Sequence, residues 1–132
     1  MPKRSEAFEW LQFARDDLAA GRLLLTDAGL PERLACFHAQ QAAEKALKAL
    51  LVSADVQFRK THDLAVLVAL APDADADAFH AVDLQRLQQW AVDARYPADL
   101  PDLTRGDASE VLAIAESVLE IVADALGRAH PN

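Results

Sequence analysis

Apolar residues recur every three or four positions along most of the chain, the spacing that places them on one face of a helix. This periodicity predicts three long helices, over residues 5–27, 31–54 and 107–128. No stretch alternates between apolar and polar residues as a half-buried strand would. The most regular apolar stripe lies in the last helix and consists of Val111, Ile114, Ala115, Val118, Ile121, Val122 and Ala125.

The middle of the chain is predicted to form shorter pieces. Thr61 is placed to cap a short helix over residues 62–71, and a fourth long helix is expected over residues 78–94. Pro97 and Pro101 end that helix, because proline lacks the N–H group that a helix interior needs. The complete pattern predicts an all-α fold, an up-and-down antiparallel four-helix bundle with an additional short helix.

Length and composition place the chain among ordinary globular proteins. Its 132 residues predict a single domain over residues 1–132, with the bundle core at about residues 5–128. Apolar residues make up 52% of the sequence, which is too many for a disordered chain. No stretch free of charged residues is long enough to span a bilayer, and no apolar signal-peptide core follows the first residues. We therefore expect a cytoplasmic protein without a membrane segment.

Metal and cofactor sites with known motifs are missing from the sequence. Cys36 is the single cysteine, which excludes an internal disulfide and a cysteine-based zinc site. A di-metal centre in a helical bundle needs Glu-x-x-His pairs, and the sequence has none. There is also no glycine-rich phosphate loop. We expect neither a metal nor a cofactor.

Charge is distributed unevenly along this acidic chain. The formal net charge is −8, from 13 basic and 21 acidic residues. Residues 33–62 contain five basic residues against two acidic ones, so this segment alone carries a net charge of +3. A chain this acidic is a poor general binder of duplex nucleic acid. An anionic ligand is therefore expected near residues 33–62.

Three polar groups stand out, and each has a structural and a functional interpretation. On the second helix, Glu44 and Lys48 either form an ion pair on an exposed face or line a cleft for a phosphate or a partner helix. Residues 60–64 form either a helix cap or an anion site. Residues 94–97 either end a helix or supply an arginine for phosphate and a tyrosine for base stacking. The candidate nucleotide- or anion-binding residues are Lys45, Lys48, Lys60, His62, Arg95 and Tyr96.

The same groups connect the chain to a known family. Residues 37–51 read Phe-His-Ala-Gln-Gln-Ala-Ala-Glu-Lys-Ala-Leu-Lys-Ala-Leu-Leu, residues 60–64 read Lys-Thr-His-Asp-Leu, and residues 94–97 read Ala-Arg-Tyr-Pro. In this order and spacing the sequence resembles the HEPN domain, over about residues 8–126. The resemblance implies an α-helical bundle, a small prokaryotic protein and a homodimer. It also implies a companion, a minimal nucleotidyltransferase, with which such proteins form a toxin–antitoxin-like pair.

Many HEPN proteins are metal-independent ribonucleases, and this sequence departs from their motif. The resemblance places the motif arginine at Arg95, with a histidine expected at residues 100–102, where none is found. The missing general acid or base counts against an enzyme. Arg33 and His38 have the motif spacing, but they lie on the wrong helix.

Three hypotheses follow from these observations. The first is a binding module for a nucleotide or a partner, without an intact ribonuclease motif. The second is a ribonuclease that uses Arg95 with a displaced histidine, His62 or His38. The third is a structural oligomerisation bundle, which would bind no nucleotide or RNA at all.

Overall fold

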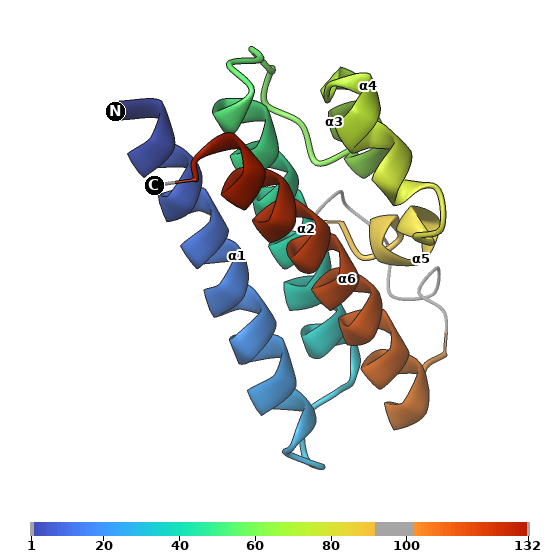
Figure 1. Cartoon of the computed structure of the whole chain (residues 1–132). Coiled ribbons are helices and arrows are strands. Elements are labelled where there is room, and N and C mark those ends of the chain that lie inside the picture. The colour runs from blue at the N-terminus through green and yellow to red at the C-terminus, as the bar shows by residue number, and fades with distance from the viewer. Residues whose placement is uncertain (1, 92–101, 132) are drawn as a thin grey trace.

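A computed structural model describes residues 2–91 and 102–131, which form helices joined by short connections (Figure 1). Three long helices lie side by side: α1 (Pro2–Leu25), α2 (Arg33–Ser53) and α6 (Arg105–Ala129). Helix α1 runs antiparallel to both α2 and α6 (Figure 1). Among the described residues, four short helices follow α2: α3 (Leu64–Leu70), α4 (Asp73–Ala76), η1 (Asp77–Phe79) and α5 (Leu84–Gln88). The predicted all-α class is confirmed.

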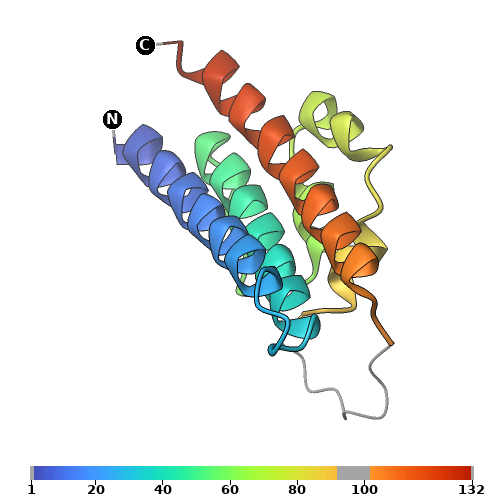
Figure 2. The same cartoon turned by 90° about the horizontal axis from the view of Figure 1, so that it is seen from below.

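Helix α2 lies at the centre of the molecule, in contact with α1, α3, α5 and α6 (Figure 2). Small side chains allow this crowding, because Ala39, Ala42 and Ala46 are fully buried and keep the neighbouring backbones close. Gly21 of α1 marks one close approach. A Cβ atom added there would lie 2.8 Å from Leu112 of α6 and 3.1 Å from the Ala35 carbonyl oxygen of α2.

The prediction of a fourth long helix over residues 78–94 is wrong for the part that the structure describes. This part forms η1, a turn and the five-residue α5. Asp83 interrupts the helical pattern, because its carboxylate accepts a hydrogen bond from the Arg86 N–H and so caps α5. Three apolar residues of this segment nevertheless reach the core, since Phe79, Leu87 and Trp90 are buried. The apolar spacing predicts that Leu84, Leu87 and Ala91 face inward; Leu87 does, whereas Leu84 and Ala91 are only partly buried. Residues 92–94 lie outside the described chain.

The other predicted helix starts shift by two or three residues, with α2 beginning at Arg33 instead of residue 31, α3 at Leu64 instead of residue 62 and α6 at Arg105 instead of residue 107. Helix α1 begins at Pro2 rather than at Ser5. Helix α3 is capped by Asp63, whose carboxylate accepts hydrogen bonds from Ala65 and Val66, and not by Thr61. Thr61 instead accepts a hydrogen bond from the Asp63 N–H at 3.1 Å. No helix in the described part is long and apolar enough to cross a membrane.

Candidate functional site

Helix α2 buries three polar side chains along the side that the loop of residues 57–63 approaches. Gln40 is 0% exposed, Glu44 3% and Lys48 8%. Lysine and glutamate are almost never this buried unless they are paired, because removing a charge from water costs free energy. The polar groups of these residues must therefore satisfy one another or a neighbouring element.

The Glu44 carboxylate is the centre of this arrangement. It accepts a hydrogen bond from Lys48 Nζ at 2.9 Å, from His62 Nδ1 at 2.8 Å and from Gln40 Nε2 at 3.3 Å. Gln40 Nε2 also lies 3.3 Å from the His62 carbonyl oxygen, and Gln41 donates to Gln40 Oε1 at 2.8 Å. We call Gln40, Glu44, Lys48 and His62 the Glu44 cluster. It joins α2 to the loop that precedes α3.

His62 connects the cluster to solvent, since 38% of its side chain is exposed. In the contact with the Glu44 carboxylate, Nδ1 of His62 is the donor, so Nε2 is the ring nitrogen left for other partners. Lys48 is covered on a different side by Trp10 of α1, whose ring centroid lies 5.7 Å from Nζ. This distance allows a cation–π contact between α1 and α2.

A second cluster repeats the same three chemical groups between α1 and α2. Asp17 Oδ1 lies 2.9 Å from His38 Nδ1, and Asp17 Oδ2 accepts from Lys45 Nζ at 2.5 Å. All three side chains are partly buried. We call Asp17, His38 and Lys45 the Asp17 cluster. Each cluster thus holds one lysine and one imidazole on a single carboxylate.

Of the six predicted site residues, the structure brings Lys48 and His62 together on Glu44 and places Lys45 in the separate Asp17 cluster. Lys60 is exposed in the loop next to Arg59. The interpretation of Glu44 and Lys48 as an ion pair on an exposed face is half correct: the pair forms, but it is buried. Arg95 and Tyr96, predicted to contact phosphate and base, lie outside the described residues.

Sequence reasoning missed Asp17 and undervalued His38. The available signal was the polar stripe of α2, in which His38 and Lys45 are seven residues apart and therefore on one helix face. A carboxylate on a neighbouring helix is the natural partner for such a pair, and Asp17 supplies it. Nothing in the stripe itself points to position 17 of the chain.

Cys36 and metal ligands add no further chemistry to this region. Burial raises the pKa of the Cys36 thiol to about 12, so the reactive thiolate is disfavoured at neutral pH. In the described ranges, no group of three or more histidine, cysteine, aspartate or glutamate side chains is arranged to hold a metal ion.

Comparisons with known proteins agree with this architecture. The HEPN domain family model matches residues 7–125. A Methanocaldococcus jannaschii protein named "Putative toxin MJ1304" is 28% identical, with 89% of this chain and 86% of the relative aligned. The solved structure of ST0689, described as an archaeal HEPN homologue, has a TM-score of 0.71 and 26% identity, covering 92% of this chain and 98% of that one. TT1696 from Thermus thermophilus has a TM-score of 0.69 and 32% identity, covering 91% and 98%. This chain belongs to the HEPN domain family.

Proposed function

We propose that the chain works as one cytoplasmic HEPN domain that binds a nucleotide or a partner, as the HEPN half of a toxin–antitoxin-like pair. Its companion is a small nucleotidyltransferase, and the HEPN half is a homodimer. The relative named as a toxin supports the pair. The Glu44 cluster carries the proposal, because the buried Glu44 and Gln40 hold His62 in the loop where Arg59 and Lys60 are exposed.

The chemistry of this region suits an anion. The His62 ring is held by Glu44 and is 38% exposed, so it needs little reorganisation to face a ligand, and the exposed Lys60 adds an ammonium group. Lys48 is paired with Glu44 and buried, so it supports the site from beneath. Residues 33–62, which contain most of this region, carry a net charge of +3, whereas the rest of the chain is acidic. Arg95 and Tyr96, which lie outside the described residues, are proposed to contribute an arginine for phosphate and a tyrosine for base stacking.

Equilibrium binding of ATP tests the nucleotide part of the proposal. A charged hydrogen bond contributes about 1.5–3 kcal/mol. We therefore expect Lys60→Gln combined with Arg95→Gln to weaken ATP binding by about tenfold or more. Arg33→Gln serves as the control, since Arg33 is exposed at the start of α2 and outside both clusters. Unchanged affinity in the double variant would remove these residues from the site.

Isolation of the tagged protein at native abundance tests the partner. We expect mass spectrometry to recover a small nucleotidyltransferase in stoichiometric amount. Recovery of the HEPN protein alone would refute the two-protein module. A flat thermal-shift screen with nucleotides would in addition favour the structural bundle, because a ligand at a hundred times its dissociation constant stabilises by about 2.7 kcal/mol.

One observation favours a second candidate, a metal-independent ribonuclease. His38 and His62 each hold a carboxylate through Nδ1, the arrangement that fixes the tautomer of a general base. In this candidate function Arg95 acts together with one of the two imidazoles. The test is cleavage of RNA in EDTA: His38→Ala or His62→Ala must abolish it. Equal cleavage by wild type and by the variant that lacks both histidines would exclude both residues.

A further inference from the structure

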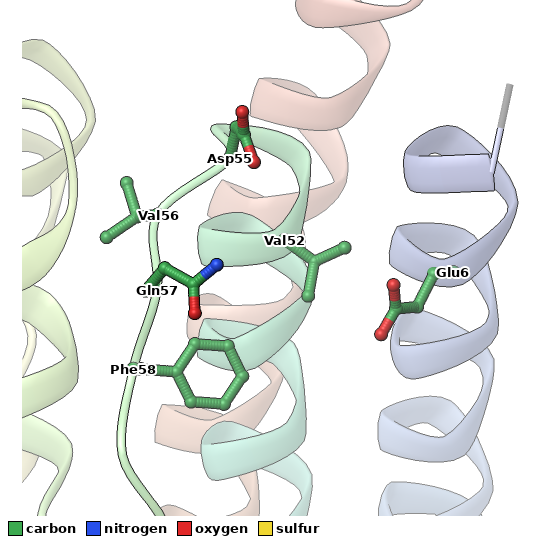
Figure 3. A pocket seen from close by; sticks show the side chains of 6 residues that line it. All are labelled: Glu6, Val52, Asp55, Val56, Gln57 and Phe58. Carbon is green, nitrogen blue, oxygen red and sulfur yellow. The ribbon is translucent and has the colours of Figure 1, made fainter.

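A pocket of about 330 Å³ lies at the C-terminal end of α2, and none of its lining residues belongs to either cluster. Six residues line it: Glu6, Val52, Asp55, Val56, Gln57 and Phe58 (Figure 3). We call it the Phe58 pocket. Its volume is at the small end of ligand sites, which suits a ligand of few carbon atoms.

The end of α2 shapes this pocket. The Asp55 N–H donates to the Val52 carbonyl at 3.1 Å, and the Val56 N–H donates to the Leu51 carbonyl at 2.9 Å. These two bonds, with Asp55 at a φ of 58°, form a Schellman motif. The chain then runs back along α2, and the Phe58 ring points toward α1 (Figure 3).

Two kinds of surface meet in the pocket. Val52 and Phe58 are half-buried and supply an apolar wall, whereas Glu6 and Gln57 are exposed at its rim. The Val56 side chain points to the other side of the loop (Figure 3). The Glu6 carboxylate of α1 faces the α2 side of the pocket (Figure 3). Asp55 already has an interaction of its own, so Glu6 is the carboxylate assigned to a ligand.

Three features of this pocket favour a cation. An aromatic face attracts a positive charge, and the attraction increases when the charge is partly desolvated. Glu6 supplies a formal negative charge. The C-terminal end of α2 adds the partial negative charge of its last carbonyl groups. The apolar wall suits a methylene chain. A metal ion or a bare ammonium ion would leave that wall uncovered.

We propose that the Phe58 pocket binds a primary alkylammonium group, with its methylene chain on Val52 and Phe58 and its nitrogen at Glu6. A free aliphatic diamine and a lysine side chain both carry this chemistry. The site shares no residue with the Glu44 or the Asp17 cluster, although Gln57 and Phe58 belong to the same loop as His62.

Titration of the whole protein with 1,4-diaminobutane, followed by ¹H–¹⁵N NMR at low ionic strength, tests the proposal. We expect saturable shifts at Val52, Gln57 and Phe58. Glu6→Gln should weaken binding by about threefold or more, and Phe58→Leu by a similar factor, as the loss of a partly exposed cation contact predicts. Glu9→Gln is the matched control, an exposed carboxylate of α1 that does not line the pocket.

The outcomes separate specific binding from attraction to an acidic chain. Equal weakening by Glu6→Gln and Glu9→Gln, or an unchanged affinity in Phe58→Leu, would overturn the proposal. Shifts induced equally by 1-butanol would overturn it as well, because the nitrogen would then be irrelevant. Thermal unfolding checks that Phe58→Leu is folded. If Phe58→Leu does not fold, the comparison of Glu6→Gln with Glu9→Gln still tests the proposal, because both positions are exposed. The source of the alkylammonium group is tested by titrating Nα-acetyl-lysine methylamide separately. If it binds more tightly than the diamine, the ligand is a lysine side chain; if the diamine binds more tightly, the ligand is a free amine.

Discussion

Replacing Glu44 by glutamine removes the negative charge on which Lys48 and His62 depend. Glutamine has almost the same shape, so the change is electrostatic rather than steric. Removing one partner of a buried ion pair costs about 3–5 kcal/mol, because the remaining charge is left buried. Lys48 is 8% exposed and has the Trp10 ring beside it, which allows partial relaxation. We therefore expect Glu44→Gln to lower the free energy of unfolding by about 3 kcal/mol.

Urea and thermal unfolding followed by circular dichroism measure this loss. In a chain of this length, about 3 kcal/mol corresponds to a decrease in Tm of about 10 °C. Glu120→Gln is the matched control, since Glu120 is exposed on α6, and its effect should stay within about 0.5 kcal/mol. The reasoning also predicts that Lys48→Met partly restores the stability of Glu44→Gln, because no unpaired ammonium then remains buried. A loss below about 1 kcal/mol, or strictly additive losses in the double variant, would refute it.

The other predictions concern positions outside the clusters. Gly21→Ala should destabilise the protein by about 1 kcal/mol in urea unfolding, since crowding against α2 and α6 exceeds the gain in helix propensity. Gly127→Ala, with nothing within 4 Å of its added Cβ, should stabilise it by up to about 1 kcal/mol, and the same sign at both sites would contradict this reasoning. Hydrogen bonds from the backbone and side chain of Thr104 lower the pKa of the Asp107 carboxyl, so its stabilisation is present at neutral pH and is lost as the pH falls through that lowered pKa. Asp107→Asn should therefore lower the Tm at pH 7, with a difference from wild type that shrinks in acid; a constant difference would disagree. Cys36 should resist iodoacetamide at pH 8 in the native protein and react fully in urea, and rapid native labelling would show that the thiol is accessible.

The long helices could be predicted from the sequence because their burial repeats locally. A stripe such as that of α6 specifies its own period and its own buried face. The segment over residues 78–94 has a similar apolar spacing, yet Asp83 offers its carboxylate to the backbone and interrupts the helix. Periodicity indicates which face of a segment is apolar. It does not show whether a polar side chain competes with the helix for backbone hydrogen bonds.

The candidate site was only partly predictable for a different reason. The Glu44–Lys48 pair follows from residues four apart on one helix. Its burial depends on the loop that carries His62, eighteen positions further along the chain. The Asp17–His38 contact likewise joins positions 21 residues apart. Such contacts arise from the approach of separate elements, so a pattern within either element does not encode them.

The burial of α2 has a consequence for how this protein can change. Thirteen of its 21 residues are buried, and they surround the helix with apolar neighbours on some sides and with the Glu44 cluster on another. In a library of random substitutions, α2 should therefore accept the smallest repertoire of amino acids. The loop of residues 57–63 and the outer face of α1 carry more exposed positions. New binding specificities can arise on those two surfaces while α2 stays almost unchanged.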